Sequence, residues 1–342
     1  MESDKKIKRA TPESHPSSQL DPALYQQKQS MLFRLPQELR LKIYEHLFSS
    51  KRLQWHFRKT SHPMRPESTP RQTLALVRTC HRVKDEIGDS WVGQIHLTFR
   101  TPEIMLDVLT ELPVSTLSKI RHVRVTAEPV LTQPPPVRPQ TRFYFISALL
   151  KLLPGLRLDT LTIQGTSPIL TFWGSKILDE LISRSCGWKE LYYITREVTL
   201  LGFRHRPVRD HPQPENWQRI MDDRDGTETK PSITIYRSTH PIMDDNTSLA
   251  FERDMPDDWT AGVTLGTNLN ENLFKTIGDR RGIMVVVKGG LGVDYEEKEG
   301  SPLLEKDIRS DAPGMTWQEI QYVYDPYSAL YINDEFCYVQ YR

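Results

Sequence analysis

The sequence predicts an α/β protein in which an N-terminal helical module precedes a mainly parallel sheet domain with β-α-β units. Two observations carry this prediction. An amphipathic helix occupies residues 35–48, and strand-like segments recur about every 30–40 residues with one helix between neighbours. Parallel strands need crossover connections, which are usually helical and right-handed. The expected organisation is a disordered tail at 1–30, the helical module at 31–100 with an inserted loop at 49–73, and an α/β domain with C-terminal strands at 101–342.

The first helix has a continuous apolar row. Its members follow one another at intervals of four residues and so remain on one side of the helix: Leu35, Leu39, Ile43 and Leu47. Pro36 suits the first helical position, because the first turn needs no N–H donor there. Glu38 complements the positive end of the helix dipole. The sequence therefore marks both the start of this helix and its apolar face.

A second amphipathic stretch covers residues 74–87. Its apolar positions share one face: Leu76, Cys80, Val83 and Ile87. The pattern Leu-Pro-x-Glu-Leu-Arg-x-x-Ile-Tyr from residue 35, with Leu-x-x-x-x-Thr-Cys-x-Arg from residue 74, resembles the fungal group of F-box-like proteins. The resemblance covers roughly residues 31–100. The chain departs from a typical F-box by lacking a tryptophan near Val83 and by the long polar segment at 49–73.

An F-box docks a protein onto the Skp-type adaptor of an SCF ubiquitin ligase. The resemblance thus implies a non-catalytic substrate receptor with an adaptor and a cullin as partners, and with a protein target that the sequence does not identify. The adaptor-binding residues that it implies are Leu35, Pro36, Leu39, Ile43, Leu47, Leu76 and Val77. The alternative is a structural α/β scaffold whose F-box-like helices belong to the core and bind no adaptor. Solvent exposure of the leucine row distinguishes the two.

The C-terminal segment 317–342 is rich in aromatic residues and predicts a closing hairpin. Aromatic side chains often anchor protein interfaces. We therefore expect a target-binding surface here, with at least one exposed aromatic residue beside charged ones. The candidates are Trp317, Tyr322, Tyr324 and Tyr327.

Between these ends, apolar and polar residues alternate as in half-buried strands at 95–99, 120–126, 158–163, 188–195 and 233–236. The segment 283–288 is apolar up to its final Lys288, which predicts a strand that is buried on both faces. Helices are expected at 102–112, 143–153 and 175–185. The polar, proline-containing segment 204–230 predicts a long loop, and the glycines at 289–292 predict a turn.

Composition restricts the function further. The chain has 45 Lys and Arg against 44 Asp and Glu, so no global field favours nucleic acid or anionic membranes. Three widely spaced cysteines and the absence of an apolar membrane segment or signal peptide indicate an intracellular protein of the cytoplasm or nucleus. No catalytic motif, metal-binding pattern or cofactor signature is present, so we expect no enzyme, metal or cofactor. The basic, aromatic stretch at 51–59 leaves nucleic-acid association as a less favoured alternative.

Overall fold

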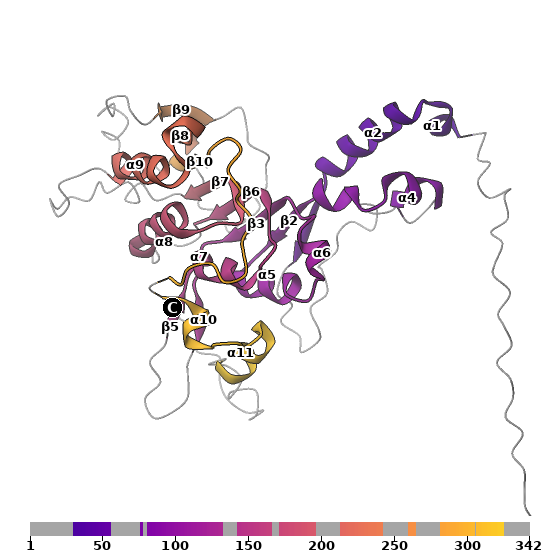
Figure 1. Cartoon of the computed structure of the whole chain (residues 1–342). Helices are drawn as coiled ribbons and strands as arrows, with labels where there is room; N and C mark the ends of the chain where they lie inside the picture. Colours follow the sequence, from indigo (N-terminus) through magenta and orange to yellow (C-terminus); the bar gives the residue numbers. More distant parts are fainter. Residues whose placement is uncertain are drawn as a thin grey trace, which may run out of the picture.

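The computed structural model describes residues 30–55, 76–77, 81–132, 142–165, 171–195, 213–241, 259–264, 281–304 and 306–324. Its main element is an eight-stranded sheet with the order β1-β2-β3-β6-β7-β10-β8-β9 (Figure 1). The strands are β1 (Arg52–Trp55), β2 (His96–Phe99), β3 (His122–Thr126), β6 (Leu158–Gln164), β7 (Trp188–Thr195), β8 (Ser232–Pro241), β9 (Trp259–Thr264) and β10 (Arg281–Lys288). The first five in this order are parallel, and β10, β8 and β9 are joined by antiparallel pairings. The predicted α/β class with a mainly parallel sheet is confirmed.

Helices surround this sheet and extend it at one end. They are α1 (Met31–Arg34), α2 (Gln37–Ser49), α4 (His81–Ile87), α5 (Pro102–Leu109), α6 (Val114–Leu117), α7 (Ile146–Leu149), α8 (Thr171–Arg184), α9 (Gln213–Asp225), α10 (Ile308–Asp311) and α11 (Trp317–Tyr324). Short 3₁₀ turns occur at η2 (Ser90–Gly93), η3 (Leu150–Leu152) and η6 (Thr227–Thr229), and β4 (Val130–Thr132) pairs with β5 (Arg142–Tyr144) as a separate two-stranded sheet.

The core lies against one face of the sheet. Alternate residues of the parallel strands form in-register apolar rows, such as the buried row Leu97, Val123, Leu161 and Leu191. The strand order advances in one direction along the chain from β1 to β7, so right-handed crossovers place their helices on the same face. Figure 1 shows α5, α7 and α8 together on that side. The opposite face of β1, β2, β3 and β6 carries half-buried polar side chains.

The predicted strands and the buried strand are confirmed. Residues 283–287 of β10 are all buried, as a strand covered on both faces requires. The predicted helices at 102–112 and 175–185 correspond to α5 and α8. The helix expected over 143–153 is wrong at its start, where residues 142–144 form β5, and it is reduced to α7 and η3.

The inserted loop expected at 49–73 is wrong in its first part. Residues 52–55 form β1, which pairs with β2 in parallel register, from Arg52 opposite His96 to Trp55 opposite Phe99. The rings of Trp55 and Phe99 stack with their centroids 4.9 Å apart. Trp55 packs against the core, so its ring is not available to stack on a nucleic-acid base. This weakens the nucleic-acid alternative. The predicted boundary at residue 100 also falls inside one continuous sheet, since β1 and β2 both precede it.

The loop expected at 204–230 is wrong for residues 213–225, which form α9. Trp217 and Met221, one helical turn apart, are both buried, and the Trp217 indole N–H donates to the carboxylate of Asp179 on α8. Pro214 misled the prediction, because a proline in the first turn of a helix breaks no hydrogen bond. Tertiary packing thus selects a helix where composition predicts a loop.

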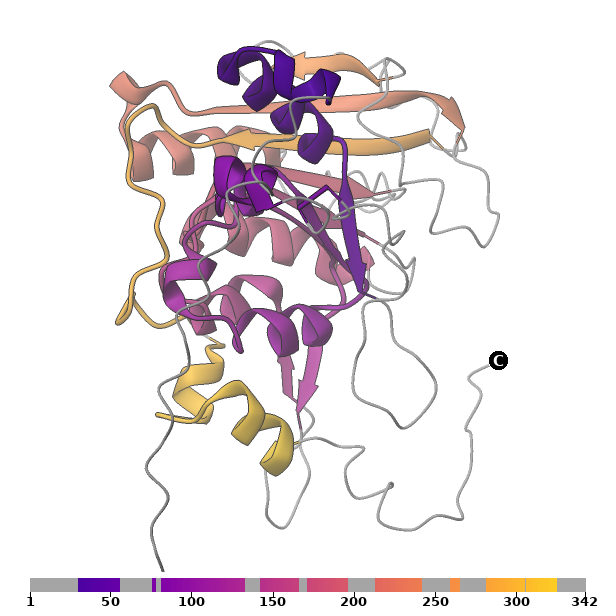
Figure 2. The ribbon, with the colours of Figure 1, turned by 90° about the vertical axis from the view of Figure 1, so that its right-hand side faces the viewer.

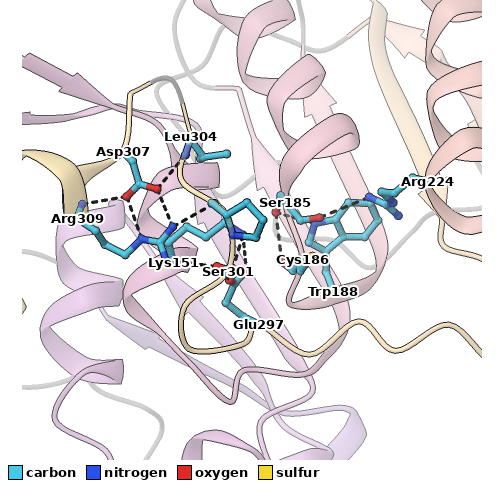
Figure 3. Close-up of polar contacts among 11 residues, drawn as sticks. Lys151, Ser185, Cys186, Trp188, Arg224, Glu297, Ser301, Leu304, Asp307 and Arg309 are labelled. Carbon is cyan, nitrogen blue, oxygen red and sulfur yellow. Dashed lines mark hydrogen bonds and ion pairs between the residues drawn. The ribbon is translucent and has the colours of Figure 1, made fainter.

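The chain after β10 crosses the start of β6 and β7 as an extended segment. Gly155 N–H donates to the Glu297 carbonyl at 2.7 Å, and Glu297 N–H donates to the Leu156 carbonyl at 3.0 Å. The Glu297 carboxylate, fully buried, pairs with Lys151 at 3.0 Å and accepts a hydrogen bond from Ser301 at 2.6 Å. Figure 3 shows these side chains pointing toward one another. A second pair, Asp307 with Arg309, fixes the chain just beyond.

Candidate functional site

The candidate site is helix α2 with its neighbours α1 and α4, which extend from the end of the sheet nearest β1 and β2 (Figure 1). Pro36 caps α2 with extended backbone, and its carbonyl accepts from the N–H groups of Leu39 and Arg40. Glu38 lies in the first turn, as expected. The sequence therefore predicted the start of this helix to within one residue.

The two long sides of α2 have opposite character. Residues four apart on one side are buried: Arg40, Tyr44 and Phe48. The leucine row lies about 100° around the helix from them, since each residue advances by that angle. In that row Leu39 is 47% exposed and Ile43 is 44% exposed. This helix buries an arginine and leaves aliphatic side chains in water, which reverses the usual pattern.

Exposed apolar residues are concentrated here. Among the residues that the structure describes, nine large apolar side chains are exposed, and four of them lie between positions 31 and 43: Met31, Leu39, Leu41 and Ile43. Leu41 lies on the other side of α2 from the leucine row. Clustered exposed apolar groups, unlike scattered ones, mark sites of association. The face formed by Leu39 and Ile43, with Leu35 and Leu47 half-buried at its ends, is hereafter the leucine face.

A polar cluster around Glu86 of α4 holds α2 in this orientation. The Arg40 guanidinium donates from Nε to Glu86 Oε2 at 2.9 Å and from Nη2 to Glu86 Oε1 at 2.6 Å. It also donates to the Leu35 carbonyl, which ties down the junction of α1 and α2. Arg82 and Tyr44 donate to the same carboxylate at 3.1 Å and 3.3 Å. Such a two-pronged arginine–carboxylate pair fixes orientation as well as distance.

The electrostatics of this cluster follow from its geometry. Hydrogen bonds from Arg40, and then from Arg82, hold the pKa of Glu86 below its usual value. The same carboxylate raises the pKa of Arg40, and burial raises the pKa of the Tyr44 phenol. Glu86 is therefore ionised and Arg40 protonated at neutral pH, while the Tyr44 phenol is neutral. The Phe33 ring of α1 lies under both guanidiniums, 5.8 Å from Arg40 and 4.6 Å from Arg82, which adds a cation–π contact.

The predicted adaptor-binding residues differ in their positions. Pro36, Leu39 and Ile43 are exposed, and Leu35 and Leu47 are half-buried. Leu76 and Val77 are half-buried and pack against the core. The structure thus places Leu39 and Ile43 of α2 on one exposed surface, whereas Leu76 and Val77 contribute to packing.

The predicted target-binding aromatics do not form one surface. The prediction that Trp317 is an exposed anchor is wrong. Trp317 is buried, and its indole N–H donates to Asp107 of α5 at 2.6 Å. The hairpin expected from residue 317 is also wrong over 317–324, which form α11, because Trp317 and Ile320 pack on the core with helical spacing. Tyr322 is 86% exposed, with the exposed Glu319 one turn earlier. The side chain of Tyr324 and all of Tyr327 lie outside the described residues.

Sequence reasoning missed the residues that orient the site. The cluster consists of Arg40, Tyr44, Arg82 and Glu86. Glu86 lies outside the quoted motifs, and Arg82 is the arginine of the second one. Arg40 and Tyr44 belong to the first, where they were not assigned a role. Their spacing of four was a usable signal, since it places both on one helix face. Glu86 lies 46 residues from Arg40, and no local pattern links the two.

Two further findings concern the described part of the chain. No group of three or more His, Cys, Asp or Glu side chains there could hold a metal ion. None of the described helices has the length and apolar character needed to cross a membrane. Comparisons with protein-family models, with curated proteins and with solved structures gave no match for this chain.

Proposed function

We propose that this chain is a non-catalytic interaction protein, the substrate receptor of an SCF-type ubiquitin ligase, and that α2 docks onto a Skp-type adaptor. The observation that carries the proposal is the exposure of Leu39 and Ile43 on a helix that packs against the rest of the protein through Arg40, Tyr44 and Phe48. The resemblance of residues 35–44 to the F-box-like pattern names the partner.

The physical argument is one of helix-in-groove recognition. An apolar helix face that is already folded and oriented loses little conformational entropy when a partner covers it. The Glu86 cluster supplies that orientation, because it fixes α2 against α4 through charged hydrogen bonds. Had these helices served only as core, the leucine row would be the face expected to pack inward. The scaffold alternative is therefore the less favoured one.

The test is direct binding of the purified chain to a Skp-type adaptor, measured by calorimetry. Leu39→Asp places an unpaired carboxylate in an apolar interface, so affinity should fall more than about 100-fold. Circular dichroism and melting should stay close to those of the unchanged chain, because Leu39 is exposed.

Gln37→Asp is the matched control. It adds the same charge to the same helix at an exposed position on a different side, and it should keep normal affinity. Failure of the unchanged chain to bind any Skp-type adaptor, or normal binding by Leu39→Asp, would overturn the proposal. Unfolding of Leu39→Asp would favour the scaffold alternative.

A further inference from the structure

Helix α11 presents an exposed face at the end of the molecule opposite to α2 (Figures 1 and 2). Its inner side is held on the core by Trp317 and Ile320. Its outer side consists of four exposed residues: Gln318, Glu319, Tyr322 and Val323. Tyr322 is the most exposed of the large apolar side chains in the part of the chain that the structure describes. An aromatic ring that is presented to water on a folded helix is available to a partner.

Carboxylates line the side of α5 on which α11 packs. Glu103, Asp107 and Glu111 follow one another at intervals of four residues, which places them in one row along α5 and the turn after it. This set is hereafter the carboxylate row. Glu111 is exposed, and the other two are half-buried. Within the described residues, no member of the row forms an ion pair with a lysine or an arginine.

Two hydrogen bonds place the outer face of α11 next to this row. The Gln321 amide donates to Asp107 Oδ1 at 2.8 Å, and the Gln318 amide donates to Thr110 Oγ1 at 3.0 Å. Tyr322 follows Gln321 directly, and it lies one helical turn beyond Gln318 on the same side of α11. The exposed ring and the carboxylate row therefore belong to one surface.

The electrostatics of the row favour a positively charged partner. Burial raises the pKa of Asp107, and the neighbouring Glu111 raises it further. Burial also raises the pKa of Glu103, with smaller contributions from Glu128 and Asp107. Ionisation of these carboxyl groups is thus disfavoured in their present surroundings. A cation placed beside them would favour the ionised form.

We propose that the surface formed by Tyr322 and the carboxylate row binds a basic segment of a target protein. The carboxylates receive lysine or arginine side chains, and the Tyr322 ring offers its face to the same cations. Successive members of the row are about 6 Å apart along the helix axis, at a rise of about 1.5 Å per residue. Alternate residues of an extended peptide are about 6.6 Å apart. The match favours a segment with lysine or arginine at every second position.

A peptide fits the row better than a metal ion does. Within the described residues, no group of three or more His, Cys, Asp or Glu side chains could hold one ion. The row extends over about 12 Å, so it suits several separate cations on one chain. The whole protein has 45 Lys and Arg against 44 Asp and Glu, so a basic peptide is not attracted by its net charge and must rely on a local surface.

This inference deepens the proposed function by naming the class of target, and it rests on that function only for calling the bound protein a target. Helices α2 and α11 lie at opposite ends of the molecule, as Figure 2 shows. An adaptor on α2 and a target on α11 can therefore be bound at the same time.

The test uses the full chain and a short fluorescent peptide of alternating lysine and serine, with binding followed by fluorescence anisotropy. Three competitors are compared with it. They are the same peptide with glutamate in place of lysine, a peptide of equal composition whose lysines stand in adjacent pairs, and calcium ions. We expect the alternating lysine peptide to bind best, and its affinity to fall as salt is raised.

Glu111→Lys reverses the charge at the exposed end of the row and should weaken binding of the lysine peptide about fivefold or more. Tyr322→Ala removes the ring and should weaken it about threefold, whereas Tyr322→Phe keeps the ring and should bind normally. Asp223→Lys, exposed on α9, makes the same change of charge away from this surface and should bind normally. Leu39→Asp should also bind normally, so failure of adaptor docking and failure of this inference give different results.

The inference is overturned if the lysine peptide does not bind the unchanged chain, or if its binding survives both Glu111→Lys and Tyr322→Ala. Equal binding of the glutamate peptide would contradict the assignment of a basic target. Displacement of the lysine peptide by calcium at a lower concentration than the peptide would assign the row to a metal ion instead. Equal binding of the peptide with paired lysines would overturn the match to every second position.

Discussion

Helices α2 and α11 each pack on another helix, α2 on α4 and α11 on α5, yet they differ in which of their side chains are buried. Helix α11 packs Trp317 and Ile320 inward and presents Tyr322, Val323 and polar residues to water. Helix α2 buries Arg40 beside Tyr44 and Phe48 and leaves Leu39 and Ile43 exposed. The comparison teaches that apolar periodicity identifies a helix face, whereas tertiary partners decide whether that face is core or surface.

We expect the largest change in stability from a substitution on the buried side of α2, and almost none from one on its exposed side. Phe48 is fully buried, so Phe48→Ala removes a ring from the core and should lower the free energy of unfolding by about 3–5 kcal/mol. Leu39→Ala, on the exposed side, should change it by less than about 0.5 kcal/mol. Urea denaturation followed by fluorescence measures both. Equal losses for the two variants would remove the distinction between a core side and a docking side.

A smaller effect tests α11 in the same way. Trp317→Phe removes the indole N–H that donates to Asp107 and leaves this half-buried carboxylate with only its hydrogen bond from Gln321, which should cost about 1–3 kcal/mol. Tyr322→Ala should be near neutral for stability, because that ring is almost fully exposed. Thermal melting compares the two. A neutral Trp317→Phe would mean that α11 contributes little to the folded domain.

The smallest effect concerns pH and should have opposite signs at the two helices. The pKa of Glu86 is lowered below 4.5, so its contribution to stability is present above that pH and is lost as pH falls through the lowered value. Burial raises the pKa of Asp107 above 3.8, so its contribution is greatest in acid and is lost as pH rises through the raised value. Acid should therefore loosen α2 from α4 while it secures α11 on α5.

Amide hydrogen exchange at several pH values, corrected for intrinsic rates, resolves the two helices separately. Glu86→Gln should abolish the pH dependence of exchange in α2 and leave that of α11 unchanged. Asp107→Asn should do the reverse. Parallel behaviour of both helices would show that global stability, and not these carboxylates, governs the response.

Much of the sheet could be predicted because its strands obey alternation. Strands β3, β6 and β7 place every second residue in the core over most of their length, and residues 283–287 of β10 are all apolar. The failures have physical causes. Strand β1 is only four residues long, and its pairing with β2 is what makes it a strand. Helix α9 has a proline at its second position, where a proline breaks no hydrogen bond of the helix.

The candidate site was predictable in composition but not in orientation. The leucine spacing and Pro36 located α2 in the sequence. Arg40, and not Leu39, faces inward because it pairs with Glu86, which lies on a separate helix. For the C-terminal aromatics the missing information was the position of Asp107, whose carboxylate lies within reach of the Trp317 indole. Partners that are distant in sequence decided both outcomes.

The buried pair of Lys151 and Glu297 has a consequence for the order in which the protein is made. Lys151 is almost completely buried, and its counter-charge arrives 146 residues later in the chain. A nascent chain that has emerged only as far as β10 holds the lysine without a carboxylate, which strongly disfavours its burial. The sheet therefore reaches its final packing late in synthesis, and a product truncated before Glu297 should be recognised as misfolded by the cell's quality control.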